Sequence, residues 1–173
     1  MNTWKIDNMH SEIGFKVRHM MISNVSGSFG TFDATLTSEE DFQNPSFDFT
    51  AEVNSIQTGV ADRDGHLKSG DFFNAEAFPQ LTFRSTSVEK NDANWVINGE
   101  MTIKGTSHPV TLHADFAGVA VDPYGQTKTG LSLTGKIKRS DFGLTWSAVT
   151  EAGNIVLGDE ITLNAEVQFV KQA

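Results

Sequence analysis

Long runs in which apolar and polar residues alternate one by one constrain this sequence more than any other feature. In ITLNAEVQF (161–169) and SFDFTAEV (46–53) every second residue is apolar, and the residues between them are polar. Alternation with a period of two places all the apolar side chains on one face of an extended strand. A fold made from such strands has to bury one face of each strand against an interior.

Comparable runs recur along the chain, at residues 13–20, 95–103, 110–118 and 131–137. Residues typical of turns lie between these runs, at 91–94, 123–125 and 157–159. In VSGSFGTFDATL (25–36) the apolar residues change from odd to even positions near Gly30, where we expect a bulge that bends one strand. The pattern predicts an antiparallel meander.

Antiparallel strands of this kind form either a sandwich or a closed barrel. Several of the runs are long, and long strands with bends at glycine favour a barrel. The predicted fold class is therefore all-β, an elongated eight-stranded antiparallel barrel, in a single domain that covers residues 1–173. A barrel of that size holds packed side chains or one small ligand.

The composition excludes several functions. The chain has no cysteine, so it has no disulfide, thiolate metal site or thiol nucleophile, and its net charge of −9 argues against nucleic-acid binding. Its 13 phenylalanines give a ligand contact area without hydrogen bonds, or simply a core rich in phenylalanine. No apolar run is long enough to span a membrane. We expect a cytoplasmic protein as the sequence is written, or a periplasmic one if Met1 is an engineered start.

Two stretches interrupt the strand pattern: SDFGLTW (140–146), where Ser140 could cap a single helical turn, and roughly residues 60–78, which include ADRDGHLKSGDFF (61–73). The spacing and composition of the longer stretch predict a short helix, which would point Asp62, Asp64 and His66 in different directions and so disfavours a metal site. An acid and base pair of Asp64 and His66 is an alternative, but no nucleophile lies near them in the sequence. We expect a helical lid, with Asp62 or Asp64 capping its N-terminus, Arg63 paired with a carboxylate, and Phe72 turned inward.

The sequence resembles the YceI-like family through an ordered set of motifs that covers nearly the whole chain. These motifs are WKID (4–7), HS (10–11), Phe15, HM (19–20), GSFGTF (27–32), RDGHL (63–67), DFF (71–73), FP (78–79), TF (82–83), GEMTIKG (99–105), PVTL (109–112) and RSDFG (139–143). The resemblance implies a lipocalin-like barrel whose tunnel holds a long isoprenoid chain, either an isoprenoid quinone or a polyprenyl phosphate. It also implies a homodimer and a link to stress responses. It implies no catalytic residue, cofactor or metal.

The expected ligand contacts combine the inward alternating residues with polar groups near an end of the barrel. The apolar contacts are Phe15, Val17, Phe29, Phe47, Phe49, Phe72, Phe83, Leu112, Phe116, Leu131, Leu133 and Phe169. The polar contacts, expected to meet a head group, are His19, Arg63 and His66. Two alternatives stay open: an enzyme for a hydrophobic substrate that uses Asp64 and His66, and a structural barrel with a filled core.

Overall fold

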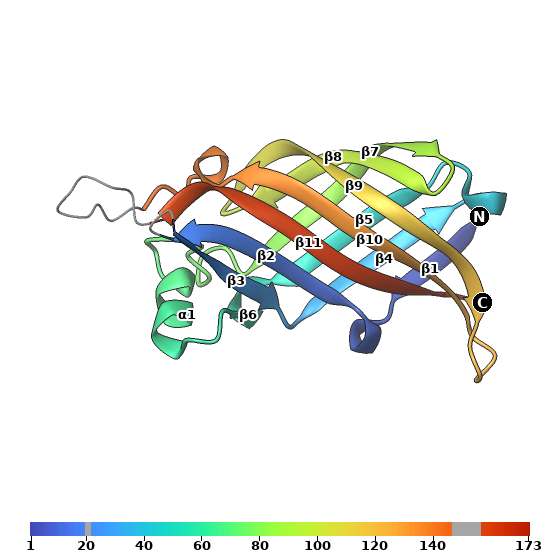
Figure 1. Cartoon of the computed structure of the whole chain (residues 1–173), viewed down its shortest axis with the longest axis horizontal. Helices are drawn as coiled ribbons and strands as arrows, with labels where there is room; N and C mark the ends of the chain where they lie inside the picture. Colours follow the sequence, from blue (N-terminus) through green and yellow to red (C-terminus); the bar gives the residue numbers. More distant parts are fainter. Residues whose placement is uncertain (20–21, 147–156) are drawn as a thin grey trace.

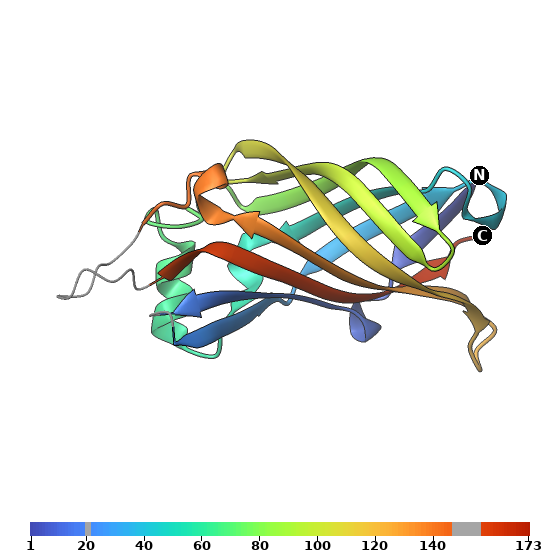
Figure 2. The ribbon, with the colours of Figure 1, turned by 45° about the horizontal axis from the view of Figure 1, so that its top comes forward.

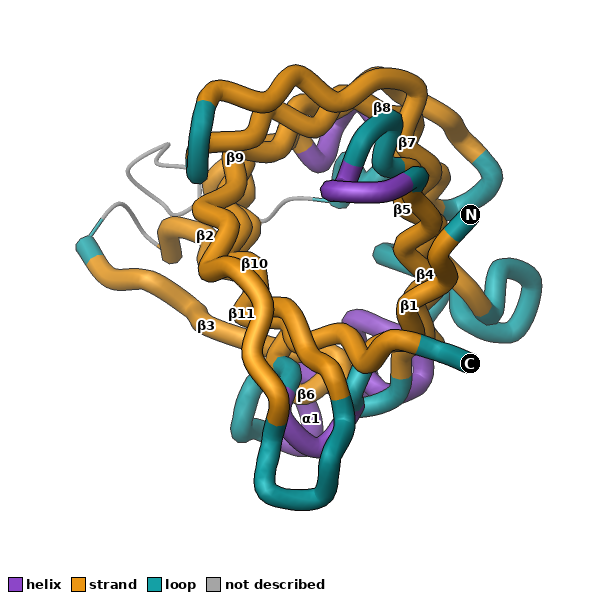
Figure 3. The backbone as a smooth tube through the Cα atoms, turned by 90° about the vertical axis from the view of Figure 1, so that its right-hand side faces the viewer, coloured by secondary structure: helices purple, strands orange, loops and turns teal. Residues whose placement is uncertain are grey.

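The computed structural model describes residues 1–19, 22–146 and 157–173, and its strands form one antiparallel sheet that closes on itself (Figures 1 and 3). The ring contains eight strands, of which the last pairs with the first. In spatial order they are β1 (Asn2–Ile6), β4 (Phe32–Ser38), β5 (Ser46–Glu52), β7 (Gln80–Asn91), β8 (Asn94–Ile103), β9 (Thr106–Val121), β10 (Thr127–Lys138) and β11 (Leu157–Lys171). The predicted eight-stranded antiparallel barrel is confirmed.

Three further strands extend the sheet from β11, namely β2 (Glu12–His19), β3 (Ser23–Phe29) and β6 (Ile56–Gln57). β11 pairs with β1 at its C-terminal end and with β2 along its earlier half. A 3₁₀ turn at Asn8–His10 separates β1 from β2, so the first strand of the chain bends sharply between its two pairings.

The partner segment bends at the same level, and here the predicted single bulged strand over 25–36 is wrong. β3 and β4 are separate strands that pair with β2 and β1 respectively, with Gly30 and Thr31 at the corner between them. The predicted turn at 157–159 is wrong as well, because β11 begins at Leu157. Its pairing with β2 shifts register between Leu157 and Ile161, so the glycine there marks an irregularity within a strand.

Helix α1 (Ala61–Lys68) lies at the end of the barrel away from the two chain termini (Figures 1 and 2). Three more short 3₁₀ turns connect strands: Glu40–Phe42 between β4 and β5, Val53–Ser55 between β5 and β6, and Arg139–Phe142 after β10. The helix therefore lies at one end of the barrel only.

An aromatic cluster fills the opposite end. We call Trp4, Phe42, Trp95 and Phe116 the aromatic plug. The rings of Trp95 and Phe116 stack at 4.6 Å, and the Phe42 ring lies 4.9 Å from Phe116 and 5.2 Å from Trp4. Phe42 comes from the loop between β4 and β5 and has a φ of +56°, a strained value for a bulky residue. Lys90 secures this loop by donating from Nζ to the Phe42 carbonyl oxygen (2.5 Å).

Candidate ligand-binding cavity

Between the aromatic plug and α1 the barrel is hollow. The cavity there has a volume of about 380 Å³, and the side chains that line it are overwhelmingly apolar. At the end near α1, which we call the mouth, the lining residues His66 and Trp146 are partly exposed, Trp146 by 37%. An apolar space that is open at one end and filled at the other fits an elongated apolar ligand.

Most of the expected ligand contacts line this cavity. They are Phe15, Val17, His19, Phe29, Phe47, Phe49, Arg63, His66, Phe72, Phe83, Leu112, Leu133 and Phe169. The structure places the other two, Phe116 and Leu131, in the filled half: Phe116 belongs to the aromatic plug, and Leu131 is buried one inward position beyond Leu133. Alternation identified the inward face correctly but carried no information about depth.

Two cavity-lining rings point their Cζ ends at glycines, which give these rings room at the wall. A methyl group on Gly27 would overlap the ring of Phe15, and a methyl group on Gly99 would overlap the ring of Phe83. Gly27 faces Phe15 directly across the β2–β3 pair. The missing side chains therefore provide the room in which these rings pack, and the width of the cavity depends on them.

The polar contacts of the lid differ from those that the sequence predicted. Val60, whose side chain cannot accept a hydrogen bond, occupies the N-cap of α1, so the predicted capping by Asp62 or Asp64 is wrong. Asp64 instead accepts hydrogen bonds from the backbone amide (2.8 Å) and hydroxyl (2.6 Å) of Thr58. Arg63 donates from Nε to the Thr58 hydroxyl (2.7 Å) and from Nη2 to its carbonyl (2.7 Å), not to the predicted carboxylate.

Thr58 therefore anchors the helix, and it leaves part of the Arg63 guanidinium available. A guanidinium has five N–H groups, and the contacts with Thr58 use Nε and one N–H of Nη2. Arg63 is half-buried and lines the cavity at its mouth. This arrangement presents a positively charged hydrogen-bond donor to whatever enters.

His66 contributes to the mouth mainly through its ring. Its Nε2 lies 2.9 Å from Asp71 Oδ2, and its ring meets Phe72 and Trp146 edge-on, with centroids 5.1 and 4.7 Å away. Since Asp71 engages His66 and Thr58 engages Asp64, the two residues of the acid and base hypothesis each have another partner. Nothing in this geometry favours proton transfer between them.

Arg139 is a mouth residue that the sequence reasoning missed. It lines the cavity, is only 5% exposed, and donates to the carbonyl oxygens of Leu144, Trp146, Leu157 and Gly158 at 2.6 to 3.2 Å. Burial lowers the pKa of its guanidinium, and the negative charge of Asp159 opposes that shift. Arg139 follows Ile137 in the alternating run from Leu131, so its inward direction was visible in the sequence.

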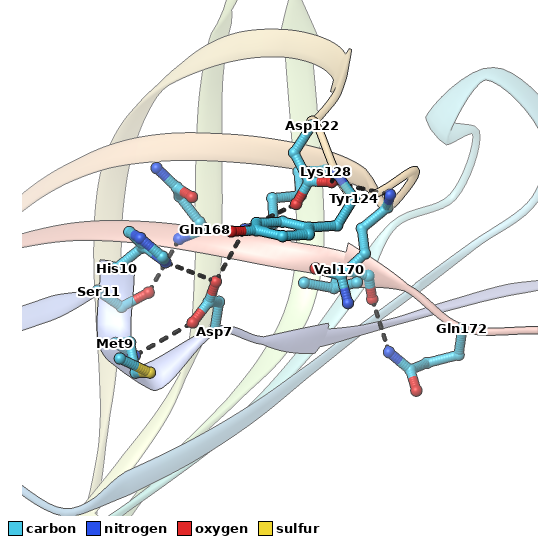
Figure 4. Close-up of polar contacts among 11 residues, drawn as sticks. Asp7, Met9, His10, Ser11, Asp122, Tyr124, Lys128, Gln168, Val170 and Gln172 are labelled. Atoms are coloured by element: carbon cyan, nitrogen blue, oxygen red, sulfur yellow. Dashed lines mark hydrogen bonds and ion pairs between the residues drawn. The ribbon is translucent and has the colours of Figure 1, made fainter.

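A second polar cluster lies at the bend between β1 and β2 (Figure 4). Asp7 Oδ2 lies 2.8 Å from His10 Nδ1 and 3.0 Å from Lys128 Nζ, and Lys128 also pairs with Asp122 (3.4 Å). Burial favours a higher pKa for Asp7, but the hydrogen bonds and charges of His10 and Lys128 outweigh it, so the pKa lies below its ordinary value. These residues do not line the cavity and instead fasten the bend to β10.

Two features are absent from the described part of the chain, namely a metal-binding cluster and a membrane-spanning helix. Residues 1–19, 22–146 and 157–173 contain no group of three acidic or histidine side chains arranged to hold a metal ion. Within the same ranges, no helix has the length and apolar character needed to cross a membrane.

Comparison with known proteins identifies relatives that match almost the whole chain. The model of the YceI-like domain matches residues 4–169. Protein YceI of Salmonella newport is 39% identical, over 98% of this chain and 87% of its own. BcnA of Burkholderia cenocepacia has a similar structure (TM-score 0.82, 21% identity, 94% of this chain and 98% of its own). So does a polyisoprenoid binding domain from Saccharophagus degradans (TM-score 0.74, 12% identity, 98% of each chain).

Proposed function

The chain belongs to the YceI-like family, and on that premise we propose that it binds a long-chain isoprenoid lipid in the barrel cavity, as a carrier or storage protein and not as an enzyme. The observation that carries the proposal is the shape of the interior: a long apolar cavity, filled at one end, whose inward-facing polar groups lie at the other. An isoprenoid lipid has the same distribution, with an apolar tail and one polar head.

The tail supplies most of the expected binding free energy. Each buried CH₂ group contributes about 0.8 kcal/mol before the costs of losing freedom and ordering the chain. The phenylalanines of the lining, Phe15, Phe49 and Phe83 among them, offer this contact without polar groups that would be left unpaired. A saturated or prenyl tail therefore suits the cavity better than a ligand with internal hydroxyl groups.

We propose that the head lies at the mouth. Arg63 has N–H groups left after its contacts with Thr58, and His19 and His66 line the cavity nearby. All three side chains can donate hydrogen bonds to an acceptor. The proposed ligand is accordingly an isoprenoid quinone or a polyprenyl phosphate, both of which carry acceptor oxygens. The family resemblance extends the proposal to a homodimer with a stress-related role.

One feature of the lining favours this proposal over a structural barrel with a filled core. A structural barrel with a filled core would have packed side chains throughout its interior, whereas here the interior between Phe47 and Phe169 and the mouth contains a cavity. The domain from Saccharophagus degradans, described as polyisoprenoid binding, has the same fold at 12% identity, and that likeness supports the fold alone.

The test is native mass spectrometry of the purified protein, followed by solvent extraction and identification of the bound molecule. We expect a co-purified or added isoprenoid quinone or polyprenyl phosphate to bind in the wild type. Leu112→Asp, which places a carboxylate in the cavity, should abolish binding, whereas Thr111→Asp, its exposed neighbour on β9, should not. Failure of the wild type to bind either lipid class, or equal binding by both variants, would refute the proposal.

A further inference from the structure

The hollow part of the barrel ends at packed side chains, and its length therefore limits the ligand. This inference about ligand length rests on the proposed function. We propose that the aromatic plug sets an upper limit on the tail that the cavity accepts, with Phe47 and Phe169 as the stop. The tail enters first, the head stays at the mouth, and tails beyond about six isoprene units leave their excess outside.

On five different strands the boundary between the hollow and the filled interior falls between two successive inward residues. On each of these strands one inward residue lines the cavity. Among the described residues, the next inward residue toward the chain termini is buried and does not line the cavity. The pairs, lining residue first, are Ile6 and Trp4 on β1, Ala34 and Leu36 on β4, Ile97 and Trp95 on β8, Leu112 and Ala114 on β9, and Leu133 and Leu131 on β10. The cavity therefore ends against buried side chains on five of the eight barrel strands, and these side chains form its floor.

Phe47 and Phe169 are the aromatic residues of that floor that line the cavity. Both line the cavity, and their ring centroids are 6.2 Å apart. On its far side the Phe47 ring lies 6.5 Å from Trp95, so it rests directly on the aromatic plug. A tail that reaches these two rings meets packed aromatic side chains and no continuing channel.

The plug is held by backbone as well as by packing, which makes it a fixed stop. Trp4 lies on β1, which pairs with β4 on one side and β11 on the other, and Trp95 is 2% exposed. Phe42 is held by its loop, through the Lys90 hydrogen bond and several left-handed backbone angles. Moving these rings aside would require the end of the barrel to open, not a rotamer change.

The depth of the cavity gives the length. From Leu157 at the mouth to Phe169 at the floor, β11 advances by roughly 30 Å along the barrel axis, at about 3.3 Å per residue and a strand tilt of about 40°. One extended isoprene unit spans about 5 Å, from carbon–carbon bonds of about 1.5 Å. The distance corresponds to about six units.

The experiment is a competition among polyprenyl monophosphates whose tails differ by single isoprene units and extend on both sides of this length, read out by native mass spectrometry. For the wild type we expect the bound fraction to rise with each added unit up to about six and then to stay level or fall. In Leu133→Phe, which adds bulk just above the floor opposite Ala165, the break should move about one unit shorter. In Phe47→Ala it should move about one unit longer.

Phe83→Ala is the matched control, because Phe83 lines the wall and not the floor. It should change overall affinity and leave the break where it is. A bound fraction that rises without a break, or a break that Leu133→Phe does not move, would overturn the proposed stop even if Phe47→Ala fails to fold. Absence of binding at every length, both of polyprenyl phosphates and of isoprenoid quinones, would instead refute the proposed function.

Discussion

The two halves of the barrel are made from the same strands with the same alternation, yet one half is solid and the other hollow. In the solid half the inward positions carry Trp4 and Trp95, and Phe42 enters from a loop to complete the packing. In the hollow half the rings of Phe15 and Phe83 lie against glycines and leave the axis free. Alternation decides which side chains face inward, whereas ring size, glycine placement and loop insertions decide whether the interior is filled.

The largest expected difference between the halves is in packing energy. Trp95→Ala should lower the free energy of unfolding by about 3–5 kcal/mol, because it removes a fully packed ring and leaves a cavity. Phe49→Ala, in the wall of the hollow half, should cost about 1–2 kcal/mol, since it only enlarges an existing space. Urea unfolding of both variants measures this, and equal losses would contradict the division into two halves.

The next largest effect concerns the hydrogen bonds of Arg139 at the mouth. Arg139→Met should lower the free energy of unfolding by about 2–3 kcal/mol, because it removes the donors to the carbonyl oxygens of Leu144 and Leu157. Arg139→Lys should lose less, since an ammonium group satisfies some of the same acceptors. Denaturant melts of the three proteins provide the comparison, and a neutral Arg139→Met would show that packing alone holds this end together.

A smaller change should narrow the hollow half without removing any contact. Gly27→Ala should displace the Phe15 ring toward the axis and weaken lipid binding roughly tenfold, about 1.4 kcal/mol. Adding Phe15→Leu should restore most of the affinity, because the smaller side chain no longer needs the space over Gly27. Titrating the same polyprenyl phosphate into the single and double variants tests this, and the idea fails if the second change restores nothing.

The smallest expected effect is the pH dependence of the cluster at the β1–β2 bend. The folded pKa of Asp7 lies below its ordinary value of about 3.9, so its contribution to stability is present above that value and is lost as the pH falls through the folded pKa. Asp7→Asn should remove this contribution, giving a shallower loss of stability on acidification than the wild type shows. Thermal melts between neutral pH and pH 3 check it, and parallel curves would assign the cluster no role.

The sequence allowed the strands, their inward faces and the position of the lid to be predicted, because each depends on local periodicity. The inward direction of Arg139 could have been predicted in the same way, since Arg139 continues the alternating inward positions of β10. The entry of Phe42 into the plug was not, because it depends on left-handed backbone angles in a loop whose residues show no periodicity. The anchoring role of Thr58 was also invisible, since it arises from a turn that brings Asp64 and Arg63 back to it.

The closure of the ring has a consequence for biosynthesis. The strands that complete it, β1 and β11, come from opposite ends of the sequence and meet over only three residue pairs, from Trp4 opposite Lys171 to Ile6 opposite Phe169. A chain emerging from the ribosome therefore holds the edge of β1 unpaired until its final strand has been made. Such long-range pairing is slow, and an uncovered strand edge invites association with other chains. Truncation of the last strand should therefore yield aggregation and not a smaller soluble barrel.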